Sequence, residues 1–407
     1  MHFGIVALGL LMSASFVLAH GPDGRFIVEI KASNVEQRSQ IAQMIHIDSV
    51  TDDRVFAVVS ENDLGILKKS KAPIISLETI KTSKAVNGYY RPFLADIDFP
   101  DADTKYHTYD ETVNALNDLA TNNPDLAQVF SIGKSLENRD IWAIRISDDS
   151  VANPNKKAIV YMGTHHAREH LSTEIPLMFA QNLCDNYTTD TTLQSLLKDI
   201  EIYIIPIVNP DGTIYDIKGK SYKWWRKNRR ANRGGSYGVD LNRNYGFGWG
   251  TGGSSTNPSS DVYMGQAPFS EPETQAIRDF FNAHNNVTIA LSFHTFSELI
   301  LYPWGGRNEG IGGEDEALFK KMAGDMAAMN NYNPMQSSEL YIASGDTCDW
   351  LYGEKQVYCF TFELSPASMF EGGFYPGASI IDQVFDDNLE PMMYLAGLTS
   401  DPKKALR

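Results

Sequence analysis

The chain has 407 residues, of which 43% are hydrophobic, 11% aromatic and 21% charged. This ordinary globular composition excludes a mainly disordered, collagen-like or polytopic membrane protein, and at roughly 150 residues per domain the length predicts two or three domains. The 35 basic residues are outnumbered by 51 acidic ones, and the resulting net charge of −16 disfavours binding to nucleic acid or anionic membranes. The 3 cysteines are too few for a disulfide-stapled scaffold or a site of four thiolates.

The amino-terminal segment has the pattern of a secretory signal. Residues 5–18 are almost all apolar or small, and the run ends in Val17-Leu18-Ala19. No lysine or arginine precedes the run, but it is short for a membrane span, which needs about 20 apolar residues. We therefore expect a signal peptide over residues 1–19 and a secreted or periplasmic protein. No later segment is apolar and long enough to span a bilayer.

A small front piece follows, and its strands and helices alternate. Apolar and polar residues alternate over 25–31, as expected for a half-buried strand. Further strands are predicted over 55–59 and 73–77, and helices over 34–45 and 61–69. This order predicts a small open-sandwich α+β domain over residues 20–80. The Pro- and Asp-bearing stretch 81–104 is predicted to be an exposed linker, open to proteolysis. The front piece is then either a lobe of the main domain or a removable propeptide.

The body of the chain, residues 105–407, has the alternation typical of α/β layer folds. Strands are predicted over 157–162, 200–208, 287–293 and 357–364, and helices over 109–120 and 172–187. The fold class that we predict is a three-layer α/β/α domain with a mixed central sheet. Ligands of such sheets bind at the carboxyl ends of the strands, so the residues that follow each strand deserve inspection.

Two of these strand ends carry candidate metal ligands. His166 and Glu169, spaced i, i+3, follow the 157–162 strand, and His294 ends an apolar strand. Imidazole and carboxylate groups are zinc ligands, and a catalytic zinc site keeps three protein ligands and an open position. Two alternatives remain: His294 is a satisfied core histidine, or His166–His170 is an H-x-x-E-H motif in which His170 binds zinc and Glu169 is a base.

Seven short motifs then follow one another in a recognisable order. They are Gly163–His170, Val208–Gly212, Trp225–Arg229, Val239–Asn244, Ser292–His294, Tyr341–Gly345 and Phe360–Leu364. Between about Tyr106 and Leu398 the chain resembles the zinc carboxypeptidases of the pancreatic carboxypeptidase A/B superfamily, peptidase family M14. It is most similar to their secreted bacterial carboxypeptidase T type. The resemblance implies one zinc ion held by His166, Glu169 and His294, with His165 and His170 as neighbours only.

The resemblance also implies two catalytic residues. Glu363 would be the general base that passes a proton to the leaving amine. Arg226 would stabilise the oxyanion that develops on the scissile carbonyl. Arg226 lies in the basic run Lys223–Arg233, which by itself would also suit a nucleic-acid patch or a solvated loop. The acidic balance of the chain argues against nucleic acid.

Asn242 and Arg243 would bind the free terminal carboxylate of the substrate, because a guanidinium forks onto a carboxylate through two parallel hydrogen bonds. A structural pair between Asp240 and Arg243 is the alternative. By the same resemblance, Tyr341 lies on a loop that closes over that carboxylate and excludes water.

The pocket for the departing side chain is implied by the same likeness. Its walls would be Leu301, Gly305, Ala343, Asp346, Cys348 and Thr361. Cys348 stands at the position that separates A-type from B-type enzymes, and we expect it to be an unpaired, small apolar wall that admits bulky hydrophobic residues. Asp346 would add a carboxylate that is able to pair with lysine or arginine, although an outward-facing loop carboxylate is the alternative.

Together these features predict a secreted metallocarboxypeptidase, made as a zymogen, that hydrolyses the C-terminal peptide bond of peptides and proteins. We expect broad specificity, an activating protease, a monomer, and no nucleic acid or membrane span. Bound calcium is compatible with the many aspartates, but no compact calcium-loop motif supports it. The alternatives are an amidohydrolase of the same fold acting on cell-wall peptides or small N-acyl amino acids, and a non-catalytic binding module.

Overall fold

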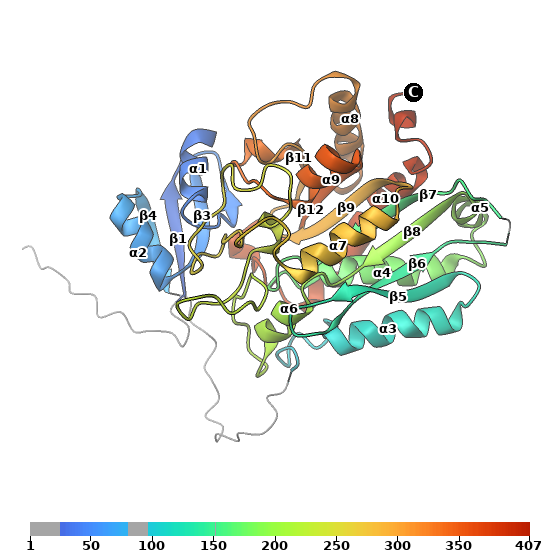
Figure 1. Cartoon of the computed structure of the whole chain (residues 1–407), viewed down its shortest axis with the longest axis horizontal. Coiled ribbons are helices and arrows are strands. Elements are labelled where there is room, and N and C mark those ends of the chain that lie inside the picture. Colours follow the sequence, from blue (N-terminus) through green and yellow to red (C-terminus); the bar gives the residue numbers. More distant parts are fainter. Residues whose placement is uncertain (1–24, 80–96, 151) are drawn as a thin grey trace, which may run out of the picture.

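Two sheets organise the chain (Figure 1). The computed structural model describes residues 25–79, 97–150 and 152–407. The expected signal peptide and most of the expected linker lie outside these ranges. Among the described helices, none combines the length and the apolar character that crossing a bilayer requires.

The smaller sheet belongs to the front piece and has the strand order β2-β3-β1-β4. The elements are β1 Arg25–Lys31, α1 Val35–Ala42, β2 Ser49–Val50, β3 Arg54–Ser60, α2 Glu61–Ser70 and β4 Ile74–Thr79. Alternate residues of β1 (Phe26, Val28 and Ile30) are buried and share a core with Ile41 of α1 and Leu67 of α2. The predicted small open sandwich is confirmed, with the short strand β2 as an addition.

The larger sheet has eight strands in the order β11-β10-β12-β9-β7-β8-β6-β5. The bounds are β5 Ala127–Lys134, β6 Asp140–Ile146, β7 Lys157–Met162, β8 Ile200–Ile205, β9 Val287–Thr295, β10 Leu299–Tyr302, β11 Asn333–Gln336 and β12 Tyr358–Leu364. The four central strands β12, β9, β7 and β8 are parallel, whereas β6 and β10 join them antiparallel. The carboxyl ends of β7, β9 and β12 therefore meet at one edge of the sheet.

Helices cover both faces of this sheet (Figure 1). They are α3 Tyr109–Asn122, α4 Leu171–Asn186, α5 Thr191–Asp199, α6 Pro210–Ile217, α7 Pro272–Ala283, α8 Gly313–Asn330, α9 Thr347–Lys355 and α10 Ile381–Leu398. Short 3₁₀ turns are Leu241–Arg243, Ser337–Glu339, Met369–Glu371, Ala378–Ile380 and Pro402–Leu406. One core contains residues of α4, α8 and α10, and the other contains residues of α7 and α9. The predicted three-layer α/β/α fold with a mixed sheet is confirmed.

Strand β7 shows why the central strands read as continuous apolar runs. Ile159 and Tyr161 point into one core, while Ala158, Val160 and Met162 point into the other. Parallel strands buried on both faces need apolar residues at every position.

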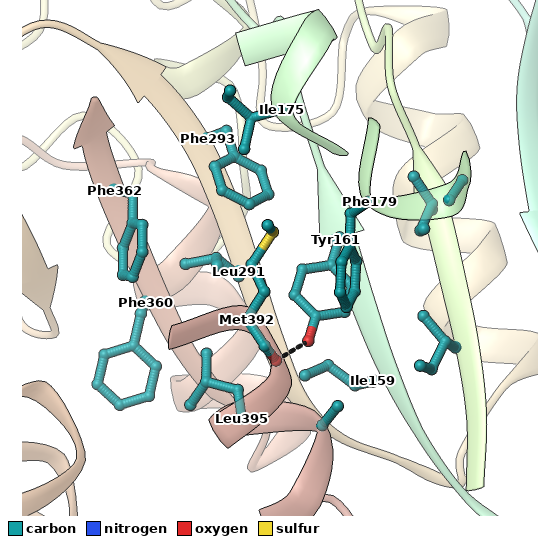
Figure 2. Close-up of a cluster of buried hydrophobic side chains, with 14 of the residues drawn as sticks. Ile159, Tyr161, Ile175, Phe179, Leu291, Phe293, Phe360, Phe362, Met392 and Leu395 are labelled. Carbon is teal, nitrogen blue, oxygen red and sulfur yellow. Dashed lines mark hydrogen bonds between the residues drawn. The ribbon is translucent and has the colours of Figure 1, made fainter. Parts of the chain in front are cut away.

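Figure 2 shows the core on the side of α4 and α10, where Tyr161 lies among aliphatic and aromatic side chains. The Tyr161 hydroxyl donates to the Met392 carbonyl over 2.6 Å. This hydrogen bond satisfies a polar group that would otherwise be costly to bury, and it ties α10 to the sheet that carries the strand ends.

The described end of the expected linker is packed only in part. Phe99 is 1% exposed and stacks on Tyr106, and Asp103 accepts hydrogen bonds from Tyr222 and from the amide of Ala378. Phe99 and Asp103 therefore attach this part of the expected linker to the body, whereas Ile97, Asp101, Ala102 and Thr104 are exposed.

Candidate active site

The exit of β7 places the first two predicted ligands. Gly163 leaves the strand where a Cβ would lie 2.0 Å from the Ser172 carbonyl oxygen, so a side chain has no room there. The chain turns through residues 164–170, held by a hydrogen bond from the Ala167 amide to the Arg226 carbonyl, before α4 begins at Leu171. The turn directs His166 and Glu169 to the same side.

His166, Glu169 and His294 converge at the carboxyl ends of β7 and β9. Nδ1 of His166 lies 2.7 Å from the Glu169 carboxylate, and Nδ1 of His294 lies 2.9 Å from it. The two imidazole nitrogens are themselves 3.0 Å apart, and all three side chains are buried. Facing nitrogen lone pairs repel unless a proton or a cation lies between them. Two imidazole nitrogens and a carboxylate oxygen are the donor set that zinc prefers, so these residues fit the ion.

The two neighbouring histidines have other partners. Nε2 of His165 lies 2.8 Å from the Tyr245 hydroxyl, and Nε2 of His170 lies 2.8 Å from Asp216. Neither histidine joins the ligand cluster. An H-x-x-E-H motif binds zinc within a continuous helix, whereas residues 166–170 here precede α4. The geometry thus agrees with the three-ligand prediction and disagrees with the alternative.

Asp240 is a site residue that the sequence did not single out. It accepts two hydrogen bonds from Arg226, at 3.0 and 2.9 Å, and its other oxygen lies 3.2 Å from Nε2 of His166. Burial opposes ionisation of Asp240, but the charges of Arg226 and His166 outweigh burial and hold its pKa well below the usual range. One buried anion thus orients both a metal ligand and the candidate oxyanion donor. Its place inside Val239–Asn244 was the available signal.

Glu363 lies beside this cluster because of strand register. In the parallel pair of β9 and β12, Glu363 stands opposite His294. Its side chain lines the crevice together with Arg226. Desolvation, followed by repulsion from the Glu169 carboxylate, raises the pKa of Glu363 well above its usual range. A carboxyl group tuned in this direction is suited to accept and return a proton near neutral pH.

Arg243 faces the crevice without an acidic partner. The guanidinium is buried, and among the described residues it donates only to backbone carbonyls, those of Gly253 and Asn242. Asp240 pairs with Arg226 instead, so the alternative of an Asp240–Arg243 pair is wrong. Within the described ranges no carboxylate lies within ion-pair distance of Arg243.

Asn242 is oriented from behind. Its Oδ1 accepts hydrogen bonds from both the amide and the hydroxyl of Thr347, each over 2.9 Å. These two donors fix the orientation of the amide group, so the Nδ2 donor is left for the crevice, which Asn242 lines. A guanidinium and an amide side by side, both donors, form a site for an anion.

The crevice encloses about 470 Å³, and five of the six predicted pocket residues line it: Leu301, Gly305, Ala343, Asp346 and Thr361. Asp346 caps the start of α9 through Oδ1, which accepts from the Asp349 amide over 2.9 Å. Its Oδ2 is buried and has no hydrogen-bond partner within the described parts of the chain. Burial raises the pKa of Asp346. The carboxylate therefore faces the crevice, and the alternative of an outward-facing loop residue is wrong.

Cys348 differs from its prediction. It forms a disulfide with Cys359 of β12, so it is neither unpaired nor a direct wall of the crevice. Its sulfur lies behind Thr361, 3.4 Å from that hydroxyl. The first turn of α9 folds back onto β12, which brings together two cysteines that are 11 residues apart. The third cysteine, Cys184, is buried and free.

The front piece covers the crevice, and the individual contacts that it makes there are not predicted from the sequence. Asp48 pairs with Arg168 over 2.7 Å, and both side chains are fully buried. Nη1 of Arg226 lies 3.1 Å from Nε2 of His46. Burial and the charge of Arg226 lower the pKa of His46 to about 3, so the ring is neutral and accepts a hydrogen bond from Arg226. The Tyr341 hydroxyl donates to the Ile47 carbonyl over 3.3 Å.

Helix α1 holds the loop around Tyr341 as well. Arg38 donates to the carbonyls of Leu340 and Glu339, and the Ile342 amide donates to Ser39. The front piece therefore binds residues 339–342 of the body both through their backbone and through the Tyr341 side chain.

This combination of a mixed sheet, a His-Glu-His cluster at its edge and an adjacent anion site defines a class of hydrolases. The family model for zinc carboxypeptidases matches residues 112–391, which is more than half of the chain. The chain belongs to the zinc carboxypeptidase family, peptidase M14, and is a metallocarboxypeptidase with zinc as its cofactor.

Individual relatives agree with this assignment. The chain is 33% identical over 370 residues to a zinc carboxypeptidase of Saccharothrix mutabilis subsp. capreolus, covering 88% of this chain and 85% of the relative. It is 33% identical over 282 residues to carboxypeptidase A1 of Mus musculus, covering 68% and 66% of the two chains. The crystal structure of carboxypeptidase A from Helicoverpa armigera superposes with a TM-score of 0.75 over 95% of this chain and 99% of that chain, at 24% identity. At this sequence identity, the structural similarity shows that the two chains share a fold.

Glu363 lies outside the cluster of candidate zinc ligands, so its expected role in proton transfer can be tested separately from zinc binding. We expect Glu363→Gln to retain zinc but to lower kcat by about 10²–10⁴, the usual contribution of a general acid or base. Glu169→Gln removes the charged ligand that lies between the two histidines, and we expect it to lose both zinc and activity. Metal analysis of the purified variants, alongside hydrolysis of an N-acylated dipeptide, measures both effects. Loss of zinc in Glu363→Gln would contradict this division of roles.

Proposed function

We propose that this protein removes C-terminal residues from peptides and proteins, and that it is secreted or periplasmic and made as a zymogen. The observation that carries the proposal is Arg243, a buried guanidinium in the crevice that meets no carboxylate of the described chain. A buried charge without a partner is costly. The carboxylate of a peptide C-terminus supplies the missing charge and accepts two parallel hydrogen bonds from the guanidinium.

The residues around this clamp divide the remaining tasks. Bound zinc supplies Lewis acidity that polarises a carbonyl and acidifies water. Arg226, held by Asp240, donates to the carbonyl oxygen as negative charge develops on it. Glu363 accepts a proton at its carboxylate and returns it to the nitrogen of the departing residue. Tyr341 covers the bound carboxylate and keeps water away.

The front piece occupies these groups in the intact chain, which supports a zymogen. His46 accepts the hydrogen bond that Arg226 is to give to the substrate, and the Ile47 carbonyl engages Tyr341. Cleavage N-terminal to Ile97 would release the front piece, since Phe99 and Asp103 attach the chain that follows to the body. An activating protease is thus part of the proposal, and so is the secretion signal over residues 1–19.

The pocket favours side chains of two kinds. Leu301 and Ala343 offer apolar walls, which suit bulky hydrophobic residues. Asp346 adds a buried carboxylate oxygen that has no hydrogen-bond partner among the described residues, and a lysine or arginine side chain of the substrate would supply one. We therefore propose release of both hydrophobic and basic C-terminal residues.

A free C-terminus is the first requirement to test. We expect an N-acylated peptide with a free carboxylate to be hydrolysed at least about 100-fold faster than its C-terminal amide, because the amide cannot take both hydrogen bonds from Arg243. Arg243→Lys is expected to lower kcat/KM for the acid and to narrow this ratio. Arg278→Lys, on the exposed face of α7, is the matched control. Equal rates on acid and amide would favour an amidohydrolase instead.

The role of Asp346 predicts a selective effect on basic residues. We expect Asp346→Asn to lower kcat/KM for C-terminal Lys and Arg at least about tenfold, because the charge facing them is lost. Release of Phe and Leu is expected to stay within about threefold. Asparagine caps helices as well as aspartate, so the variant keeps the start of α9.

Glu339→Gln, a carboxylate change elsewhere in the crevice lining, is the control for general charge effects in this assay. Unchanged release of Lys and Arg by Asp346→Asn would contradict the pairing with basic side chains, and the hydrophobic half of the proposal would stand alone.

Inhibition by the front piece can be measured on the intact chain. With a site for a sequence-specific protease placed between residues 85 and 91, we expect cutting to raise activity at least about tenfold. Asp48→Asn removes one charge of the buried pair with Arg168, which typically costs about 3–5 kcal/mol. We expect this variant to raise the activity of the uncut chain and to leave that of the cut chain unchanged.

Glu29→Gln, which changes an ion pair on the front sheet away from the crevice, serves as the matched control. An uncut chain as active as the cut one would show that the front piece is a permanent lobe rather than an inhibitor.

A further inference from the structure

The Cys348–Cys359 disulfide lies at the meeting point of the substrate-binding residues. Cys348 is in the first turn of α9, directly after Asp346 and Thr347. Asp346 lines the crevice, and Thr347 holds Asn242 through two hydrogen bonds. The cysteine therefore anchors the segment that carries both the pocket acid and the support of the carboxylate clamp.

Its partner belongs to the strand that carries the proton acceptor. Side chains alternate along a strand, so Cys359, Thr361 and Glu363 of β12 share one face. The next residues along the strand, Phe360 and Phe362, lie in the opposite core. The disulfide thus joins the binding segment covalently to the strand face that presents Glu363.

The other hydrogen bonds of the binding segment, residues 341–349, run to the front piece and to neighbouring loops, and among the described residues none of them runs to the backbone of β12. Residues 341–346 precede α9 and belong to no helix or strand. Tyr341 and Ile342 bond to the front piece, and farther on, the Ala343 amide donates to Gly305. If the front piece is removed, as the proposed function requires, the first of these attachments are lost. The hydrogen bonds to the loops of the body remain, and the disulfide remains as the covalent link between the segment and β12.

We propose that the Cys348–Cys359 disulfide is a positioning element for substrate recognition. It holds segment 341–349 against β12, so that the side-chain pocket and the carboxylate clamp keep a fixed relation to Glu363. This inference rests on the proposed function, because it concerns how a terminal residue is bound. The two cysteines contact no substrate atom themselves: both are buried, and Thr361 lies between Cys348 and the crevice.

The consequence is an effect on binding more than on the chemical step. Two free sulfurs need more room than a bonded pair, and the surrounding core is closely packed. The segment and Thr361 border the open crevice, so the extra room is taken there. Terminal residues with large side chains touch both Thr361 and the segment, whereas a terminal glycine touches only the carboxylate clamp.

The test compares oxidised and reduced enzyme after the front piece has been cut away. A trialkylphosphine reductant delivers two electrons and, with two protons, converts the disulfide to two thiols, while the phosphine takes oxygen from water to become its oxide. Mass spectrometry after alkylation counts the thiols, and metal analysis follows zinc. Kinetics are measured on N-acylated dipeptides ending in Phe, Arg or Gly.

We expect reduction to raise KM for Phe and Arg about tenfold, to change kcat less than threefold, and to affect Gly less than either. Reoxidation should restore the original KM. Cys184→Ser, in which no third thiol competes for pairing, is the background for both states. The double variant Cys348→Ala/Cys359→Ala has no disulfide to reduce, so its KM values should not respond to the phosphine.

Three results would overturn the proposal: three alkylatable thiols in the untreated protein, unchanged KM values after verified reduction, or a fall of kcat for all three peptides with KM unchanged. The last result would assign the disulfide to stability alone. The comparison of oxidised and reduced enzyme still tests the proposal if the double variant folds poorly, because both Cys348 and Cys359 are present in it. Failure of the proposed function would give a different result from failure of the disulfide proposal. The C-terminal amides would then be cleaved as fast as the acids in either redox state.

Discussion

Two imidazole nitrogens held 3.0 Å apart in a buried site are the constraint around which this molecule is arranged. Such a pair is unfavourable without a cation between its members, and the Glu169 carboxylate beside it balances the charge that a cation brings. Parallel register makes the pair possible, because β7 and β9 are neighbours and release their chains at the same edge. Asp240 then fixes the outer side of His166 and shares its charge with Arg226. The candidate metal ligands and Arg226, the proposed oxyanion donor, are in this way parts of one hydrogen-bonded unit.

Much of this arrangement is readable from the sequence, and the reason is local. Apolar runs such as 157–162 bury both faces, and the residues that follow them must lie at a strand end. The motif Gly163–His170 therefore predicts where two ligands emerge, and a histidine that ends the apolar run of β9 supplies the third. The peripheral strands β10 and β11 are four residues each and carry too little pattern to be predicted.

Contacts between segments that lie far apart along the chain could not be predicted from the sequence. Nothing near Cys348 indicates that α9 reverses onto β12, and a pairing over 11 residues depends wholly on that reversal. His46 and Asp48 belong to no recognisable sequence motif. Their role depends on the contacts that the folded chain makes between them and Arg226 and Arg168. That Arg243 has no carboxylate partner among the described residues likewise depends on which side chains the fold places around it. Residue type predicts chemistry well, but the absence or presence of a partner emerges only in three dimensions.

The face of β12 that carries Cys359, Thr361 and Glu363 has a consequence for how much of a polypeptide is removed at a time. Residues two apart on a strand are separated by about 6.6 Å, close to twice the rise per residue, and this length cannot change without breaking the ladder with β9. In the function that we propose, Thr361 of the pocket and the proton acceptor Glu363 are thus set one such interval apart. Under this proposal, the fixed strand spacing keeps the distance from the side-chain pocket to the proton acceptor constant, so that one residue of the substrate is accommodated between them.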